Sequence, residues 1–449
     1  MLPTLSALAT RLGAGTTSAV ALTEDALARA ADPAGEGARV YLHVDAEGAR
    51  RAAAAADLLR PGAPRSAIDG LPISVKDLFD VAGQTTRAGS VVLADAAPAA
   101  RHAEVVQRLR AAGAVIVGRT NMTEFAYSGL GLNPHHGTPR NPWDRATGRI
   151  PGGSSSGAAV SVSDGMAAAA IGSDTGGSVR IPAAFCGLTG FKPTARRVSM
   201  AGVLPLSRRL DSVGPIAPSV ACCAALDAIL SGEDPAGTVP PPALLRGLRL
   251  AVPTTVALDA LQPAVAGAFA AALSKLSAAG AAISEIAVTP FAELAGLNTR
   301  GGLIAAEAYA WHRDLLAREQ ARYDPRVALR MLRGREMSAV ELLDLLDARL
   351  RWTAEVEAAI GGFDALLMPT IPIVAPPLAE LEASDALFGE TNLLVLRNPS
   401  FINFLDGCAL SLPCHREGEA PVGLMVAGAG GRDRRILAIG LAVEAALRA

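Results

Sequence analysis

The sequence predicts an α/β protein. Short apolar segments alternate with segments whose apolar residues recur at helical spacing, and this alternation continues along the chain from Leu71. Half of the 449 residues are hydrophobic. A chain of this length and composition can bury a large core, which excludes a disordered protein.

Helical periodicity comes first along the chain. Residues 17–31 begin with a Thr start signal and carry apolar residues at helical spacing, and residues 47–59 predict a second helix. We therefore expect residues 1–60 to form an N-terminal helical region that packs on the core, and residues 61–449 to form one α/β domain. Residues 235–241, rich in Pro and Gly, mark an internal joint.

The larger segment alternates strands and helices. Short apolar strands and amphipathic helices are expected in turn, and the C-terminal residues 423–447 predict a strand, a Gly-rich turn and a closing helix. The other expected strands are residues 73–75, 114–118, 248–253 and 365–369, and the other expected helices are residues 103–112, 261–279 and 336–360. Residues 120–153 form a long polar segment of the kind that carries functional loops.

Charge and cysteine usage exclude several classes of protein. Lys and Arg number 41 against 43 Asp and Glu, a net charge of −2 without long runs of one sign, so no nucleic-acid or anionic-membrane surface is expected. Five cysteines without a CxxC pair give no zinc pattern. The N-terminus lacks a secretory pattern, and every apolar run is too short to span a bilayer. We expect a cytoplasmic protein that holds no metal.

Residues 150–183 are rich in serine and glycine but contain no histidine or cysteine. A serine hydroxyl is a weak nucleophile until a neighbouring base accepts its proton. Residues 153–157, GSSSG, match a nucleophile elbow but lack the strand that must precede it. The chain also lacks an S-x-x-K pair and a phosphate-binding P-loop. His135 and His136 are weak candidates for a base, and a structural role is preferred for both.

The GSDTGGS segment, residues 172–178, offers a different chemistry. Successive glycines allow a chain to turn its N–H groups inward, so this loop can hold an anion beside a serine. That arrangement suits acyl transfer, in which Ser178 attacks and the amides of Thr175, Gly176, Gly177 and Ser178 hold the oxyanion. A tight Gly-rich turn between packed elements is an equally good interpretation of the composition alone.

Several segments spread over most of the chain from Leu71 form one recognisable set of motifs. They are LPISVKD at 71–77, GRTNMTEF at 118–125, NPWD at 141–144, GGSSSG at 152–157, GSDTGGSVRIPAAFCGLTGFKPT at 172–194 and PVGLMVAG at 421–428. Together these segments resemble the amidase signature hydrolases. The resemblance implies the fold of that family, with a large central mixed β-sheet covered on both faces by helices, behind the N-terminal helical layer.

The resemblance also implies the catalytic groups, a Ser–cis-Ser–Lys triad without histidine or cofactor. Ser178 takes the nucleophile position, Ser154 lies at the family's spacing of 24 residues before it, and Lys76 is the lysine of the VKD element. The peptide bond before Ser154 is expected to be cis. Lys76 follows an apolar strand, and burial there would lower its pKa enough for it to act as a base.

Other residues take supporting parts under the same resemblance. The expected substrate contacts are Ala126, Tyr127 and Ser128, and the residues expected to hold the loops without touching substrate are Asp174, Arg180 and Ser155. Residues 204–210 and 398–405 are candidates for further pocket walls, although Phe401 and Phe404 are better explained as core. Lys192 is expected in a structural turn.

The predicted function is an amidohydrolase that cleaves a small carboxamide through an acyl-serine, on carbon–nitrogen bonds other than peptide bonds. Anilides, esters and carbamates pass through similar tetrahedral centres, so aryl-acylamidase and urethanase activities stay open. The alternative is the glutaminase-like A subunit of a tRNA-dependent amidotransferase complex. A catalytically dead binding protein is disfavoured because all three triad positions are filled. The expected partner is a small-molecule amide, and a homodimer is compatible with the sequence.

Overall fold

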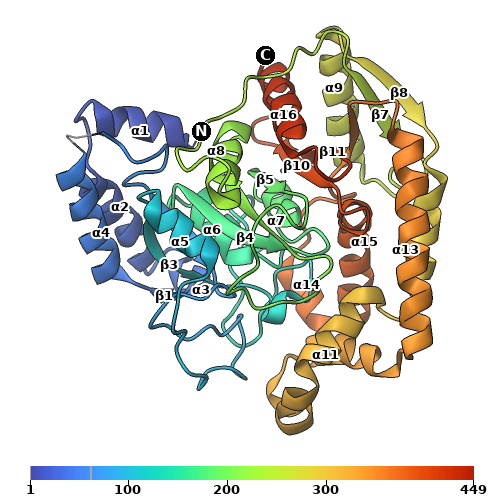
Figure 1. Ribbon diagram of the computed structural model, residues 1–449, viewed down its shortest axis with the longest axis horizontal. Coiled ribbons are helices and arrows are strands. Elements are labelled where there is room, and N and C mark those ends of the chain that lie inside the picture. Colours follow the sequence, from blue (N-terminus) through green and yellow to red (C-terminus); the bar gives the residue numbers. More distant parts are fainter. Residues whose placement is uncertain (1, 61–62) are drawn as a thin grey trace.

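The computed structural model describes residues 2–60 and 63–449. One large sheet with helices on both sides organises them (Figure 1). The strands are β1 (Tyr41–Val44), β2 (Pro72–Lys76), β3 (Val115–Thr120), β4 (Ala169–Asp174), β5 (Thr189–Lys192), β6 (Ser212–Ala217), β7 (Arg249–Pro253), β8 (Ala282–Ile286), β9 (Ala365–Pro369), β10 (Cys408–Pro413) and β11 (Gly423–Gly428).

The helices surround this sheet and vary from one turn to six. They are α1 (Leu5–Gly13), α2 (Ala19–Ala31), α3 (Gly37–Val40), α4 (Ala46–Leu59), α5 (Glu104–Ala111), α6 (Ser156–Ser163), α7 (Arg180–Phe185), α8 (Val220–Ser231), α9 (Pro263–Ala278), α10 (Leu294–Leu297), α11 (Gly302–Glu319), α12 (Pro325–Leu332), α13 (Ala339–Ile360), α14 (Leu378–Ala383), α15 (Asp385–Phe404) and α16 (Asp433–Arg448). Short 3₁₀ turns lie at Glu124–Ala126, Thr289–Glu293, Gln320–Arg322 and Arg333–Glu336.

The sheet is mixed and continuous. Its strand order is β1-β3-β2-β4-β6-β5-β10-β11-β9-β7-β8. The pairs of β2 with β3 and β4, and of β7 with β8 and β9, are parallel, whereas β4 to β11 are joined through antiparallel pairs in the middle of the sheet. The predicted α/β class and the large mixed sheet are therefore confirmed.

Strand side chains alternate between two apolar layers, which explains why the strands are buried on both faces. On β9, Leu367 packs in the cluster that contains α8, α9 and α16, whereas its neighbours Leu366 and Met368 pack against α13 and α15. On β4, Ile171 and Ala170 divide in the same way, the latter facing α6. Both faces of the sheet are thus covered by helices.

The N-terminal segment contributes to the sheet as well as to its cover. Helix α2 begins later than the expected Thr17, because the Ser18 side chain accepts a hydrogen bond from Ala21 N at 3.0 Å and caps the helix. β1, a strand that we did not predict, pairs antiparallel with β3 at the edge of the sheet. The four residues of β1 are too few to show a period in the sequence.

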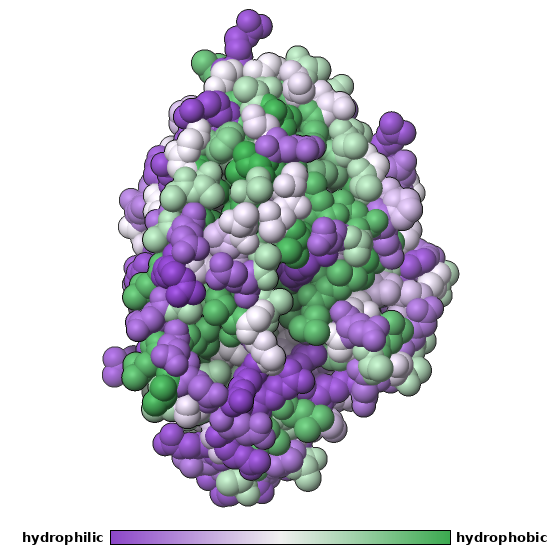
Figure 2. Space-filling model, turned by 90° about the vertical axis from the view of Figure 1, so that its right-hand side faces the viewer, coloured by the Kyte–Doolittle hydropathy of each residue, from purple (hydrophilic) through white to green (hydrophobic). Residues whose placement is uncertain are grey.

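The surface on the α13 side of the molecule carries exposed apolar side chains. Figure 2 shows this face, with hydrophobic residues (green) among hydrophilic ones (purple). Val340, Leu343 and Leu350 of α13 are among the exposed large hydrophobic side chains. All five cysteines are free thiols. Within the described residues, no helix is both long and apolar enough to cross a membrane.

Candidate active site

Lys76 ends a strand that is buried along its whole length. Its side chain is 0 % exposed, and Nζ donates hydrogen bonds to Ser154 Oγ at 2.7 Å and to Ser173 Oγ at 2.9 Å. Burial lowers the pKa of Lys76 to about 7, although the nearby charges of Asp174 and Asp211 oppose this shift. A substantial neutral fraction of this amine therefore exists near neutral pH, and neutral amine is the form that can accept a proton.

Ser154 lies in a sharp bend between the polar loop and α6. The peptide bond between Gly153 and Ser154 is cis, as the resemblance implies. Gly152 has a φ of 76°, and a Cβ on it would come within 2.7 Å of the Phe185 ring, so this position requires glycine. Gly153 N donates to Gly129 O at 2.8 Å, which ties the bend to the loop that carries the expected substrate contacts.

Ser178 lies in the loop between β4 and α7. It is 3 % exposed, and Ser155 N donates to its carbonyl oxygen at 3.3 Å, so the two serine-rich segments adjoin. Within the described chain, no protein group is hydrogen-bonded to the Ser178 hydroxyl. Ser155 Oγ donates to Ser173 O at 3.4 Å, and it thereby connects the bend to β4.

The backbone amides around Ser178 divide into two sets. In the described residues, the N–H groups of Thr175, Gly176 and Ser178 have no protein acceptor, which leaves them available to an oxyanion. Gly177 differs from our expectation, because its N–H donates to Asp174 Oδ1 at 2.8 Å. We therefore assign the Gly177 amide to holding the loop. Gly177 has a φ of 129°, and a Cβ there would come within 2.6 Å of Pro399.

Asp174 fixes the start of α7. Its carboxylate accepts hydrogen bonds from the amides of Gly177 and Val179 and from the guanidinium of Arg180, whose Nη2 also donates to Asn403 Oδ1 at 2.6 Å. Burial alone would raise the pKa of Asp174, but the charge and hydrogen bonds of Arg180 hold it below its ordinary value. Asp174 therefore stays ionised and acts as a hydrogen-bond acceptor for the loop.

The loop with the expected substrate contacts is held by two helices from the second half of the chain. Ser128 Oγ donates to Asn392 Oδ1 of α15 at 2.9 Å, and Gly129 N donates to the same oxygen at 2.9 Å. Arg330 of α12 donates to Tyr127 O at 2.6 Å. Ala126 has a positive φ of 61°, which marks the sharp turn at the start of this loop.

Helix α15 lies against two glycine-containing loops, those of Gly129 and Gly176. A Cβ on Gly129 would come within 3.2 Å of Leu396, and a Cβ on Gly176 within 3.4 Å of the same side chain. Ser400 Oγ lies 3.6 Å from the second of these positions. Leu396 of α15 therefore lies beside both Gly176 and the loop of residues 126–129, which we call the substrate loop after its expected role, and Ser400 lies beside Gly176. That residues 398–405 form a wall of the substrate pocket stays a prediction.

Phe401 and Phe404 belong to the core, as expected. Phe401 stacks on Phe291 at a centroid separation of 4.0 Å, and Phe404 packs edge-on against Trp352 at 5.2 Å. Both phenylalanines are buried. They pack α15 against α13 in the same apolar layer.

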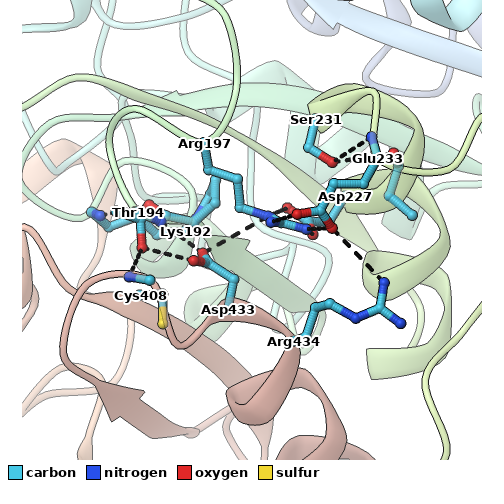
Figure 3. A network of polar contacts seen from close by, with 12 residues as sticks. Lys192, Thr194, Arg197, Asp227, Ser231, Glu233, Cys408, Asp433 and Arg434 are labelled. Carbon is cyan, nitrogen blue, oxygen red and sulfur yellow. Dashed lines mark hydrogen bonds and ion pairs between the residues drawn. The ribbon is translucent and has the colours of Figure 1, made fainter.

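A second buried lysine lies outside the site. Lys192 Nζ donates to Pro193 O at 2.7 Å and to Gly407 O at 2.6 Å, and burial together with the charge of Arg180 lowers its pKa to about 8. Figure 3 shows it beside a polar network in which Thr194 is hydrogen-bonded to Asp433 and Arg197 to Asp227. Lys192 therefore has a structural role, but it ends strand β5 and does not lie in the turn that we expected, because its backbone pairs with Ala409 of β10.

The histidines of the polar loop face a carboxylate. His135 Nε2 lies 3.0 Å from Glu124 Oε1, and this hydrogen bond raises the pKa of His135. Glu124 Oε2 also accepts a hydrogen bond from Asp324 N at 2.7 Å. Neither His135 nor His136 contacts Lys76, Ser154 or Ser178 through a hydrogen bond among the described residues. In the same residues, no cluster of three or more His, Cys, Asp or Glu side chains could hold a metal ion.

Sequence reasoning did not identify four polar residues that bear on this site. Ser173 supplies the second contact to Lys76, Asp211 accepts from Thr175, and Asn392 and Arg330 hold the substrate loop. Ser173 could have been found, because it directly precedes Asp174 in the recognised segment. The other three have no motif around them, and only the tertiary structure brings them near.

Comparison with known proteins gives one consistent family. The family model described as Amidase matches residues 21–437. The chain is 37 % identical over 409 residues to a 2-amino-5-chloromuconic acid deaminase from Comamonas testosteroni, covering 90 % of this chain and 88 % of the relative. It is 34 % identical over 477 residues to the A subunit of the glutamyl-tRNA(Gln) amidotransferase of Chloroflexus aggregans, covering 98 % and 96 %.

Solved structures agree with this result. A crystal structure described as an amidase superposes with a TM-score of 0.87 at 36 % identity, covering 98 % of this chain and 99 % of that one. The native peptide amidase of Stenotrophomonas maltophilia gives a TM-score of 0.82 at 28 % identity, covering 99 % and 97 %. These matches span nearly the whole chain, and we conclude that it belongs to the amidase family of hydrolases that act on amides.

Proposed function

We propose that the protein is a cofactor-independent amidohydrolase that cleaves a small carboxamide, at a bond other than a peptide bond, through an acyl-enzyme on Ser178. The observation that supports this most directly is the buried Lys76 amine, whose Nζ lies 2.7 Å from Ser154 Oγ. Ser154 in turn belongs to the bend that adjoins the Ser178 loop. A buried lysine with a lowered pKa is an effective base near neutral pH.

In the proposed reaction, Ser178 Oγ attacks the substrate carbonyl carbon. Its proton passes to Ser154 Oγ while the Ser154 proton passes to neutral Lys76, so that Lys76 becomes the ammonium. The same relay then returns a proton to the leaving nitrogen as the carbon–nitrogen bond breaks. Water attacks the acyl-serine by the same route, releases the carboxylic acid and restores the Ser178 hydroxyl.

The backbone supports the developing negative charge. The N–H groups of Thr175, Gly176 and Ser178, which have no protein acceptor in the described residues, are the proposed donors to the oxyanion. Such preorganised donors commonly supply a large part of the rate acceleration in acyl transfer. Asp174 and Arg180 hold this loop and do not touch the substrate in this scheme.

For the acyl group, we propose a substrate that carries a carboxylate. Arg330 lies beside the substrate loop, 5.1 Å over the ring of Phe388, and no carboxylate of the described chain forms an ion pair with it. A half-buried guanidinium with unused donors suits a carboxylate ligand. The relative from Comamonas testosteroni is named for action on an acid, which agrees with this proposal.

A substrate panel tests the proposal. Wild type and Ser178→Ala would be given matched aliphatic amides, anilides, carbamates and esters, each with and without a terminal carboxylate on the acyl side. Mass spectrometry should detect an acyl adduct on Ser178 in the wild type only, with acidic amides preferred. A full turnover rate in Ser178→Ala would refute the mechanism, and equal kcat/KM for acidic and neutral members would refute the carboxylate preference alone.

A glutaminase-like A subunit of an amidotransferase is the second candidate. It is favoured by the 34 % identity to such a protein over nearly the full length of both chains. The discriminating measurement is ammonia release from glutamine. Release that requires an added protein partner would favour this candidate, whereas turnover of panel amides by the isolated chain would favour the free amidohydrolase.

A further inference from the structure

A second carboxylate, that of Asp211, contacts the loop of residues 175–178, which we call the oxyanion loop after its proposed role. β4 and β6 are antiparallel, and their register places Ser212 opposite Asp174. Asp211, which precedes Ser212, therefore lies next to Thr175, which follows Asp174. There, Thr175 Oγ1 donates to Asp211 Oδ1 at 2.6 Å.

The Asp211 carboxylate is buried and accepts three hydrogen bonds. Asp211 is 3 % exposed, and its other oxygen accepts the backbone N–H groups of Leu206 and Ser207 at 2.9 and 3.0 Å. Among the described residues, no arginine or lysine forms an ion pair with it. The charged groups that act on it are Glu307 and the amine of Lys76. Three hydrogen-bond donors, and no cation in direct contact, hold this buried carboxylate.

We propose that Asp211 is a positioning residue of the active site: it holds Thr175 so that the Thr175 N–H points at the oxyanion. This inference rests on the proposed acyl-serine mechanism and extends it. Asp174 accepts from the amides of Gly177 and Val179, and Asp211 accepts from the Thr175 side chain, so the loop is fixed at several points. The N–H groups of Thr175, Gly176 and Ser178 still have no protein acceptor among the described residues. Asp211 itself touches no reacting atom.

The support for Thr175 continues outward to a helix. Ser207, whose amide donates to Asp211, also donates through Oγ to Glu307 Oε2 of α11 at 2.5 Å. Arg209 N donates to the same oxygen at 3.2 Å. The loop that holds Asp211 is therefore anchored on α11, so the oxyanion loop is supported by an element that contributes no reacting group.

Asp211 also has an electrostatic effect that a purely structural residue would lack. Its negative charge raises the pKa of Lys76 and partly offsets the effect of burial. Removal of that charge should lower the pKa of Lys76 further. Burial raises the pKa of Asp211 itself to about 6, so the carboxylate is ionised above that pH, where Lys76 becomes neutral.

The test uses p-nitrophenyl acetate as the acyl donor and acetylation of Ser178, measured by mass spectrometry, as the readout of chemistry. Asp211→Asn should lower kcat about 100-fold with KM within twofold of wild type, as expected for a misdirected oxyanion donor. It should also shift the rising limb of the kcat/KM profile, set by Lys76, to lower pH. Thr175→Val should lower kcat without moving that limb. Thr175→Ser, which keeps the hydroxyl, should have a kcat near that of the wild type.

Two outcomes would overturn the inference. One is a wild-type kcat in Asp211→Asn with an unmoved pH profile, and the other is an equal kcat in Thr175→Val and Thr175→Ser. If Asp211→Asn fails to fold, as judged by circular dichroism, the inference is tested by the kcat values of Thr175→Val and Thr175→Ser alone. Failure of the underlying mechanism has a separate signature, because the wild type itself would then form no Ser178 adduct.

Discussion

Arg180 and Asp174 form a bidentate ion pair in which neither side chain is exposed to solvent. Nε and Nη2 of Arg180 lie 3.0 and 2.9 Å from Oδ2 and Oδ1 of Asp174. Asp174 is the last residue of β4, the strand that leads to Ser178, and Arg180 is the first residue of α7 after it. Its energetics can be tested without any knowledge of the substrate.

Arg180→Met should destabilise the protein strongly. The variant leaves the Asp174 carboxylate buried without its cation, and the loss of one partner from a buried pair costs about 3–5 kcal/mol. Urea unfolding followed by circular dichroism measures the change. The control is Arg196→Met, which breaks an ion pair with Asp406 at a side chain that is 82 % exposed and should leave the midpoint nearly unchanged. Equal midpoints for the two variants would contradict the prediction.

The pH dependence of activity should follow the ionisation of Lys76. Because the neutral amine is the base, kcat/KM should rise with pH through a midpoint near the pKa of about 7. Lys76→Met should lose this limb together with several orders of magnitude of activity. Steady-state kinetics between pH 5 and 9 provide the test, and a wild-type rate that falls across this range would count against Lys76 as the base.

The same pKa shift predicts a pH dependence of stability. The pKa of Lys76 falls from about 10.5 in the unfolded chain to about 7 in the folded one, so between these values the unfolded chain binds more protons. The free energy of unfolding should therefore rise with pH across this window. Denaturant unfolding of wild type and Lys76→Met in parallel isolates the effect, because the variant should lack this part of the slope. Identical slopes would show that Lys76 titrates normally.

Ser173→Ala should weaken catalysis through Lys76. The variant removes one of the two hydroxyls that contact the amine, so the amine is held less firmly toward Ser154. We expect kcat to fall about tenfold, the loss that a hydrogen bond worth about 1.4 kcal/mol would cause. Ser161→Ala is the matched control, since that hydroxyl is also buried but pairs with Ser74 instead. Equal kcat values in the two variants would show that Ser173 does not contribute to catalysis through Lys76.

Leu396→Ala should widen the substrate preference. Leu396 stands between the substrate loop and the oxyanion amides, so its truncation should raise kcat/KM for bulky acyl groups relative to acetyl. A series of p-nitrophenyl esters of increasing acyl size measures this ratio. Leu393→Ala, on the same helix but 72 % exposed, should leave the ratio unchanged. A ratio that changes equally in both variants would place the acyl pocket elsewhere.

Local sequence was sufficient for much of the fold and for part of the candidate site. Strand β9 and helix α9 could be predicted because their periods are clear, and Lys76, Ser154 and Ser178 came from motifs with fixed spacing. Helix α15 was not predicted, because it contains Pro399, which usually ends a helix. Its continuation past Pro399 depends on packing against the core.

The remaining parts of the site depend on contacts between distant segments. The contact of Asp211 with Thr175 follows only from the register of β4 and β6. The hydrogen bond between Ser128 and Asn392 joins residues that are 264 positions apart in the sequence. Our expectation for Gly177 differed from the structure for a related reason. A glycine-rich loop indicates that amides can turn inward. Its composition does not reveal which of these amides donates a hydrogen bond to a nearby aspartate, as the Gly177 amide does to Asp174.

The positions of Leu396 and Asn392 relative to Lys76 have a consequence for how such an enzyme diversifies. The proposed reacting groups all come from residues 76–178, whereas α12 and α15, which hold and wall the substrate loop, come from the second half of the chain. Changes on those two helices can reshape the substrate loop without replacing any of the proposed reacting residues. One inherited chemistry can thus be paired with many substrates, and new specificities should be sought on α12 and α15 first.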